Sequence, residues 1–187
     1  MHSLASPIGA AVLVFVLCPS AGAADKPKIV QRIGPIAIDG SHDASSLRRL
    51  LGDGCYVADE GHLGGRYYTN TKRSLTFHAE FGVDWALESI DIQRGLHVPD
   101  ACQQSATLVT KLLDGPLLIQ HGIRLGMNAR ALIKVLGTPS SDKTSKGLRV
   151  LTFQTTYESD DRVGLFYDAY YAFEDGRLVL IALHDGE

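Results

Sequence analysis

The sequence predicts an α+β protein made of two tandem units, each a short helix packed on an antiparallel β-meander. Two observations predict this fold class: a short amphipathic helical segment occurs twice, and segments with period-two alternation follow each copy. We expect the first unit to span residues 25–98, a linker helix residues 99–116 and the second unit residues 117–187.

The helical segments are residues 44–52 (ASSLRRLLG) and 129–137 (ARALIKVLG), which share Ala, Leu, Leu and Gly in the same register. In both, apolar residues recur at i, i+3 and i+7, which places them on one face of a helix. Asp43 and Asn128 precede them as N-cap residues, and each segment ends in glycine. The similarity arises from a duplication or from chance likeness of two generic α+β hairpins.

Six segments are predicted to form strands, three after each helix. In residues 74–83, Phe77 and Ala79 point to one side while His78 and Glu80 point to the other. Strands of this kind are typical of antiparallel sheets with one covered and one wet face. The predicted strands are 66–70, 74–83, 87–93, 148–157, 164–173 and 178–184.

Residues 1–24 have the pattern of a signal peptide. An apolar run (residues 8–17) is followed by a helix-breaking stretch and by an A-x-A cleavage site that ends at Ala23 or Ala24. Ten helical residues span about 15 Å, which is too short for a bilayer core, so we expect no integral membrane segment. Leu17 does not fit a lipoprotein signal before Cys18, although the n-region also lacks Lys and Arg. We therefore expect an unlipidated protein that is soluble in the periplasm or secreted.

The net charge and the cysteine content limit the classes of function and the cellular compartments that fit this chain. The net charge of −3 excludes the electrostatic footprint of a protein that binds nucleic acid or anionic lipid surfaces. Cys55 and Cys102 remain after cleavage, and an even pair in an oxidising compartment predicts a disulfide, the alternative being two buried thiols. Such a bridge would stabilise the fold by roughly 3–4 kcal/mol.

Candidate catalytic groups are few. His78 and Glu80 share a wet strand face, and we expect Asp91 near them on the neighbouring strand; an acid/base pair or a metal site can be built this way. Alternating polar residues on an exposed sheet face also need no function. The sequence has no G-x-S-x-G motif, and the glycine-rich residues 61–65 lack the lysine of a phosphate loop. We expect no enzyme, no cofactor and no metal. The remaining histidines show no ligand spacing: His42, His62, His97, His121 and His184.

The tyrosines point to a binding function more than the candidate catalytic groups point to catalysis. Successive strand residues point to opposite faces, so one ring of each Tyr-Tyr pair lies on the outer face. Tyrosines near Asp, Arg and His are typical of protein-binding hot spots, although outer rings can also shield a sheet or pack between units. Residues 140–146 are expected to form a mobile loop and residues 158–162 an exposed acidic loop. The predicted partner-binding residues are Tyr68, His78, Glu80, Asp91 and Tyr170.

The second unit resembles a known family. Residues 122–139 (GIRLGMNARALIKVLGTP), 171–178 (YAFEDGRL) and 181–183 (IAL) resemble the SmpA/OmlA (BamE-like) pattern of Gly-Met, helix, Leu-Gly-x-Pro and Phe-x-x-Gly-x-Leu. The tandem arrangement resembles the β-lactamase inhibitory protein architecture. The resemblance covers most of residues 30–187, closely after residue 120 and loosely before it. Its motif residues stop a helix and form a turn, so it implies a fold more than a function.

The resemblance and the tyrosine pattern together favour a protein-binding module. We expect an enzyme inhibitor or an immunity protein whose partner is another protein, an envelope enzyme or a toxin. BamE-like proteins are single-unit lipoproteins, and this chain departs from them in being double and in lacking a lipobox. The alternatives are a structural envelope protein that supports outer-membrane assembly, and a small hydrolase or metal binder that uses His78 and Glu80.

Overall fold

The computed structural model describes residues 27–38, 42–59, 62–82, 85–105, 117–159 and 162–186. The predicted signal peptide lies outside these residues, as does most of the predicted linker helix. The described part of the linker contains a single 3₁₀ turn, η2 (Asp100–Cys102). Within the described ranges, no helix has the length and apolar character needed to cross a membrane.

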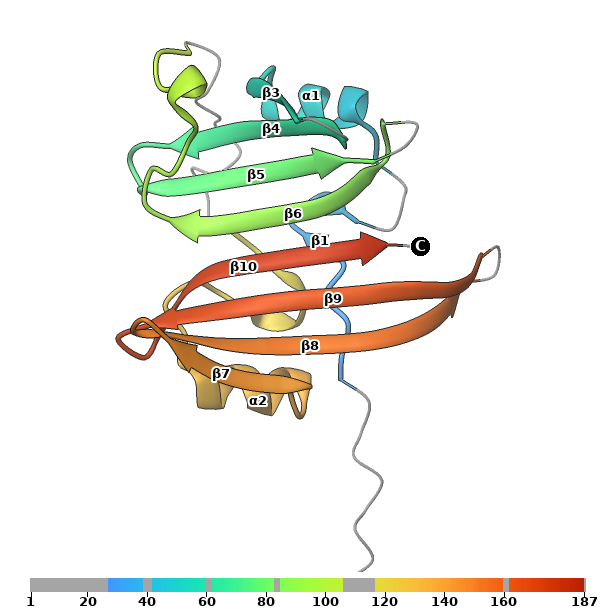
Figure 1. Cartoon of the computed structure of the whole chain (residues 1–187), viewed down its shortest axis with the longest axis vertical. Helices are drawn as coiled ribbons and strands as arrows, with labels where there is room; N and C mark the ends of the chain where they lie inside the picture. Colours follow the sequence, from blue (N-terminus) through green and yellow to red (C-terminus); the bar gives the residue numbers. More distant parts are fainter. Residues whose placement is uncertain are drawn as a thin grey trace, which may run out of the picture.

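Antiparallel strands dominate the described structure. The strands are β1 (Arg32–Ile33), β2 (Ile36–Ala37), β3 (Cys55–Asp59), β4 (His62–Asn70), β5 (Leu75–Phe81), β6 (Leu87–Arg94), β7 (Ser141–Ser145), β8 (Leu148–Ser159), β9 (Arg162–Glu174) and β10 (Arg177–Gly186). Among the described residues, β3 to β10 form one eight-stranded sheet in the order β3-β4-β5-β6-β10-β9-β8-β7 (Figure 1). A mostly antiparallel sheet with two short helices confirms the predicted α+β class.

The two helices, α1 (Ala44–Leu51) and α2 (Ala129–Leu136), lie where the sequence predicts them. The Asp43 carboxylate accepts a hydrogen bond from the Ser46 amide at 2.7 Å, and the Ser46 hydroxyl accepts one from the Asp43 amide at 2.9 Å. This capping box begins α1, and its hydrogen bonds lower the pKa of Asp43. At the start of α2, the Asn128 side-chain oxygen accepts a hydrogen bond from the Ala131 amide at 2.8 Å, without a reciprocal bond. A glycine with positive φ follows each helix and ends it.

Both helices lie on one side of the eight-stranded sheet, behind it in the view of Figure 1. We call this side the covered face and the opposite side the open face. Leu47 of α1 and Leu132 of α2 are fully buried in one core cluster with covered-face residues such as Phe77 and Phe153. The core therefore lies between the helices and the covered face.

Pairing between β6 and β10 makes this core continuous. Ile92 lies opposite Ile181, and Ile90 lies opposite Leu183. All four side chains are fully buried and belong to the same cluster as the leucines of both helices. The strands that follow α1 and those that follow α2 therefore share one sheet and one core.

A buried tyrosine binds the segment before β1 to the covered face of the sheet. The Val30 amide donates a hydrogen bond to the Tyr167 hydroxyl at 3.0 Å, across 137 positions of sequence. Tyr167 lies on β9, and burial raises its pKa to about 12. The phenol is thus held in its neutral form on the covered face.

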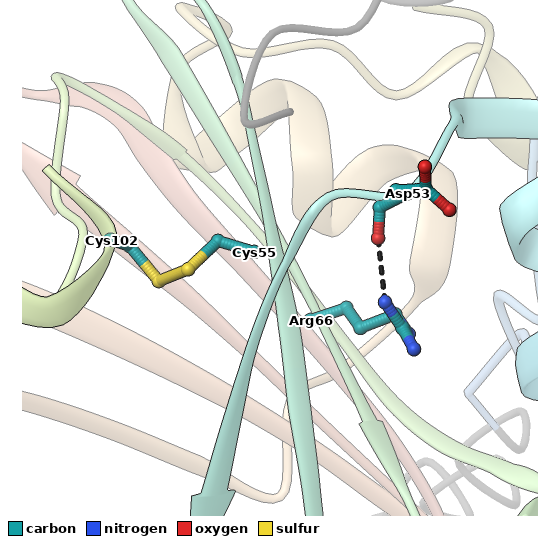
Figure 2. The surroundings of a disulfide bond; sticks show 4 residues. All are labelled: Asp53, Cys55, Arg66 and Cys102. Atoms are coloured by element: carbon teal, nitrogen blue, oxygen red, sulfur yellow. Dashed lines mark hydrogen bonds between the residues drawn. A yellow bond between two sulfur atoms is a disulfide. The ribbon is translucent and has the colours of Figure 1, made fainter. Parts of the chain in front are cut away.

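The predicted disulfide is present. Cys55 at the start of β3 is bonded to Cys102 in η2, with the Cα atoms 5.7 Å apart. Figure 2 shows the bridge and the Arg66 side chain on opposite sides of β3 and β4. The bridge lies on the open face, because Cys55 pairs with Tyr67 in the register. The sulfur atoms pack with Val57, Tyr67 and Val98, so the chain that follows β6 is fixed against one end of the sheet.

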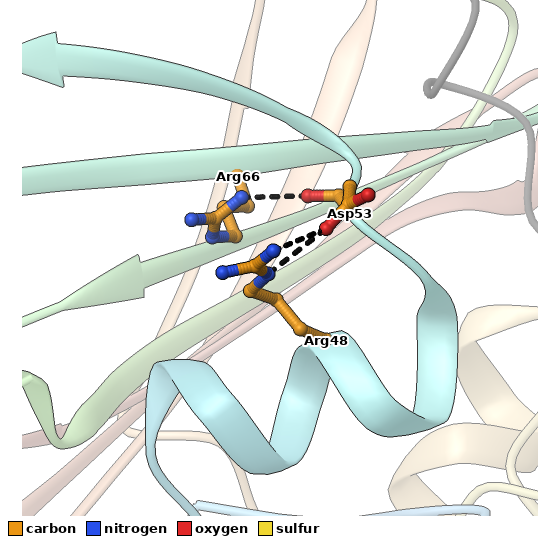
Figure 3. A network of polar contacts seen from close by, with 3 residues as sticks. All are labelled: Arg48, Asp53 and Arg66. Carbon is orange, nitrogen blue, oxygen red and sulfur yellow. Dashed lines mark hydrogen bonds and ion pairs between the residues drawn. The ribbon is translucent and has the colours of Figure 1, made fainter.

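A polar contact fastens the connection between α1 and β3 on the covered side (Figure 3). The Arg48 guanidinium donates two hydrogen bonds to the Asp53 carboxylate, at 2.5 and 3.0 Å. The Arg66 guanidinium donates to the Asp53 carbonyl at 2.6 Å. Because the Arg48 and Asp53 side chains are more than half exposed, we expect this pair to orient the connection and to add little stability.

Two predictions about local structure differ from the observed strands. The acidic loop was expected at residues 158–162, but β8 continues to Ser159 and β9 begins at Arg162, and residues 160–161 lie outside the described residues. Residues 140–146 were expected to form a mobile loop, but residues 141–145 form the edge strand β7, paired with β8. The five residues of β7 (SDKTS) include no apolar side chain, so the strand shows no alternation. Its backbone pairing and an ion pair from Arg149 to Asp142, at 2.7 and 2.9 Å, hold it instead.

Breaking the disulfide is expected to destabilise the fold without changing it. The bridge closes a chain separation of 47 residues, so the Cys55→Ser/Cys102→Ser variant should lose about 3–4 kcal/mol of unfolding free energy. Urea unfolding followed by circular dichroism measures this, with and without a reductant. Equal stability of the oxidised protein and the variant would contradict the assigned role.

Stability should also fall at alkaline pH because of Tyr167. Its pKa is about 12 in the folded protein and near 10 in an unfolded chain, so between these values the folded state holds a proton that the unfolded state has lost. The free energy of unfolding should therefore decrease from pH 10 to 12. The decrease should be shallower in Tyr167→Phe and unchanged in the exposed control Tyr56→Phe. An identical slope in all three proteins would contradict the assignment.

Candidate binding face

The open face carries one row of side chains across the sheet. Because successive strand residues point to opposite sides, alternate positions of neighbouring strands share a face. The register places Tyr67 opposite His78 and His78 opposite Asp91. Across the β6–β10 pair, Asp91 lies opposite Ala182, which lies opposite Tyr170. The row therefore runs from β4 to β9 without interruption.

His78 is the most constrained side chain of this row. Its ring stacks on the Tyr67 ring, with centroids 4.1 Å apart and an interplanar angle of 15°. Its Nδ1 atom lies 3.5 Å from Asp91 Oδ2 and 4.0 Å from Glu80 Oε1. The side chain is only 13% exposed. The ring is therefore held by an aromatic neighbour on one side and by carboxylates on its edge.

The two carboxylates beside His78 differ in their surroundings. The Ser89 hydroxyl donates a hydrogen bond to Glu80 Oε2 at 2.7 Å, and the Glu80 side chain is 51% exposed. The Asp91 side chain is 30% exposed, but its Oδ1 atom is buried and has no hydrogen-bond partner in the described part of the chain. Buried acceptor atoms are normally satisfied, so Asp91 has unused capacity to accept a hydrogen bond.

A second polar group lies on the β9 and β10 side of the row. The Tyr170 hydroxyl donates a short hydrogen bond to Asp168 Oδ2, and this bond raises the pKa of Tyr170. The Tyr170 ring also meets the His184 ring edge to face, with centroids 5.9 Å apart. Asp168 Oδ1 is buried and lacks a hydrogen-bond partner among the described residues, as Asp91 Oδ1 does.

Two hollows open on this face. One, of about 560 Å³, lies over the junction between β5, β6, β10 and β9. The other, of about 420 Å³, lies beside the chain that follows β6, and its lining includes His97 and Pro99. Tyr67 and His78 line both hollows and form the ridge between them.

The hollows are acidic. Neither is lined by Lys or Arg among the described residues, and their only basic side chains are histidines. A concave surface that is lined by carboxylates attracts cationic groups. The carboxylates that line the two hollows are Glu80, Glu88, Asp91, Asp168 and Asp185.

The structure places four of the five predicted partner-binding residues on the open face: His78, Glu80, Asp91 and Tyr170. Tyr68 is a correction. It is 0% exposed and packs edge to face against Phe77 in the core, with ring centroids 6.0 Å apart. Burial also raises the pKa of Tyr68. Because Tyr68 lies opposite Phe77 in the register, it points to the covered face, and Tyr67 is the ring on the open face.

Sequence reasoning missed Tyr67, Ser89, Asp168 and His184. A signal existed for Asp168, because it lies two residues before Tyr170 in a predicted strand and so shares its face. No comparable signal existed for the proximity of Asp168 to the His78 group. That proximity depends on the pairing of β6 with β10, which alternation does not specify.

The polar side chains of the open face are arranged in pairs of contacts. In the described residues, no group of three or more His, Cys, Asp or Glu side chains could hold a metal ion. The distance of 4.0 Å between His78 Nδ1 and Glu80 Oε1 is too long for a hydrogen bond, whereas His78 Nδ1 and Asp91 Oδ2 lie 3.5 Å apart. The face presents carboxylates and the partly exposed rings of Tyr67 and Tyr170.

Comparison of the chain with protein-family models, with curated proteins and with solved structures finds no match.

Replacing Asp168 should change the titration of Tyr170. Asp168→Asn removes the negative charge that accepts the phenol proton, so the pKa of Tyr170 should fall toward its ordinary value. Tyrosine Cζ shifts in ¹³C-labelled protein measure this as a function of pH. Glu174→Gln, an exposed carboxylate at the β9–β10 turn, is the matched control. A Tyr170 titration that does not move in Asp168→Asn would contradict the hydrogen bond.

Proposed function

We propose that the protein is an exported protein-binding module whose open face occludes a partner protein, as an enzyme inhibitor or as an immunity protein. The observation that carries the proposal is the uninterrupted row from Tyr67 to Tyr170 on a face that the hydrophobic core does not use. The aromatic and charged side chains of this row lie outside the core cluster, so the row is free to serve a binding role.

The aromatic groups suit the centre of a protein interface. Binding energy in such interfaces is concentrated in a few well-packed residues, often Tyr, that hydrogen-bonding groups surround. Tyr67 is braced by His78, and Tyr170 by Asp168 and His184. Rings that are fixed before binding lose little conformational entropy when the partner docks.

The charge of the face indicates what the partner presents. The carboxylates around the two hollows favour a surface rich in Lys and Arg, and such complementarity mainly accelerates association. The carboxylates of Glu80 and Asp91, whose side chains are 51% and 30% exposed, offer acceptors for guanidinium or ammonium groups. We infer a partner whose docking surface is basic, such as an envelope enzyme or a toxin.

The strand order supports a tandem origin for this face. Helix α1 is followed by β3 to β6 and helix α2 by β7 to β10, and the two sets meet at β6 and β10. We infer two tandem units that joined edge to edge, as in the resemblance to the β-lactamase inhibitory protein architecture. The disulfide supports export, because such bonds persist in oxidising compartments. The predicted leader and periplasmic or secreted location complete the proposal.

The proposal is tested by capture from an envelope extract with the full chain as bait. Tyr67→Ala and Glu80→Lys should each weaken the captured complex by about tenfold, because they remove a central ring and reverse a charge. Glu174→Lys has the same charge change at an exposed turn and should bind within about twofold of the parent. Surface plasmon resonance with the captured protein gives the affinities, and the association rate should fall as salt rises.

Two results would overturn the proposal. One is the absence of any captured protein when extracts and secreted toxins of related strains are all supplied. The other is a captured partner whose affinity is the same for the parent, Tyr67→Ala and Glu80→Lys, since such a partner would dock elsewhere.

A further inference from the structure

A separate cavity of about 760 Å³ lies on the covered side, at the end of the sheet where β5 starts and β6 ends. Its walls come from the residues that begin β5, from the last residue of β6 with Gly95, and from the segment 117–125. It shares no lining residue with the hollows of the open face. The site proposed for the partner protein therefore does not account for it.

Arg94 gives the cavity its character. Along β6, Ile90 and Ile92 point into the core, and period-two alternation places Arg94 on the same covered side. The register confirms this placement, because Arg94 lies opposite Leu75, a buried covered-face residue. A guanidinium thus follows two isoleucines in a row that otherwise faces hydrocarbon, and it lines the mouth of the core.

Two further arginines line the same cavity. Arg73 comes from the turn before β5, and Arg124 follows the buried Ile123. No Asp or Glu is among the lining residues. Within the described ranges, the side chain of neither Arg94 nor Arg124 forms a hydrogen bond or an ion pair. Charge of one sign is therefore concentrated here, although the whole chain has a net charge of −3.

The rest of the wall is apolar. The buried Ile119 and Ile123 form the floor with Leu75, and Leu117 and Leu125 pack against the core beside them. Leu118 is 72% exposed and also lines the cavity. An exposed leucine beside arginines provides apolar contact next to positive charge.

We propose that this cavity binds an anionic amphiphile, a single hydrocarbon chain with a carboxylate or phosphate head. The guanidinium groups of Arg94 and Arg124 bind the head by charge-assisted hydrogen bonds, and the leucine and isoleucine wall holds the chain. The volume lies in the range of small-molecule sites, about 300–1,000 Å³, which combine apolar walls with a few charged groups. An inorganic anion would leave the apolar wall unused, and a cationic lipid would meet three like charges.

Titration calorimetry on the full chain tests the proposal with dodecanoate and dodecyl phosphate, both below their micelle concentrations. At least one should bind with one-to-one stoichiometry, and the tighter of the two identifies the head group. Arg94→Ala and Arg124→Ala should each weaken binding by about tenfold, since a hydrogen bond to a charged group is lost. Arg130→Ala, on the exposed side of α2, should leave binding within about twofold.

Two further ligands distinguish the contribution of the charged head from that of the hydrocarbon chain. Dodecyltrimethylammonium has the same chain with the opposite charge and should not compete, whereas inorganic phosphate alone should bind at least about tenfold more weakly than dodecyl phosphate. The proposal is overturned if neither dodecyl anion binds, if the cation binds equally well, or if the cavity variants bind like Arg130→Ala. Thermal unfolding of each variant, compared with the parent, distinguishes a lost site from a lost fold.

Discussion

The pairing of β6 with β10 is the constraint on which the rest of this structure depends. It is antiparallel and places Ile92 against Ile181 and Ile90 against Leu183 on the covered face. The same backbone hydrogen bonds place Asp91 beside Ala182 and Ser89 beside His184 on the open face. One set of contacts therefore merges the cores behind α1 and α2 and also joins two strips of polar residues into one face. Because side chains alternate with a period of two, a slip of one residue in this pair would move isoleucines into solvent and would break the polar row.

The two faces of the sheet divide the chemistry of the protein. The covered face holds the apolar core, a neutral buried tyrosine at Tyr167 and, at one end, the arginine-lined cavity. The open face holds carboxylates, histidines and tyrosine rings, together with the disulfide that fixes the chain after β6. A core that relies on one face leaves the other free to vary, and this arrangement is why we assign recognition of a partner to the open face. It also separates the carboxylates of the open face from the arginines of the cavity.

The sequence alone was sufficient for both helices, six of the strands and the disulfide. Helix caps, period-two alternation and an even cysteine pair are local signals, and each has a direct physical cause. The strand β7 was not predicted because its five residues include no apolar side chain and are held by pairing with β8. Tyr68 was assigned to the wrong face because the pattern RYYTN is polar and aromatic on both sides, so only the register with Phe77 decides which ring is buried. The joining of the two halves could not be read from the sequence, since strand order is a long-range property that alternation does not specify.

The most direct test of this account is the measurement of cross-strand nuclear Overhauser effects between β6 and β10 in the labelled protein. The account predicts contacts between the backbones of Ile92 and Ile181 and of Ile90 and Leu183, together with slow amide exchange in both strands. Fast exchange along β6 and no contacts between these pairs would show two separate sheets. In that case neither the continuous open face nor the single core would exist in solution.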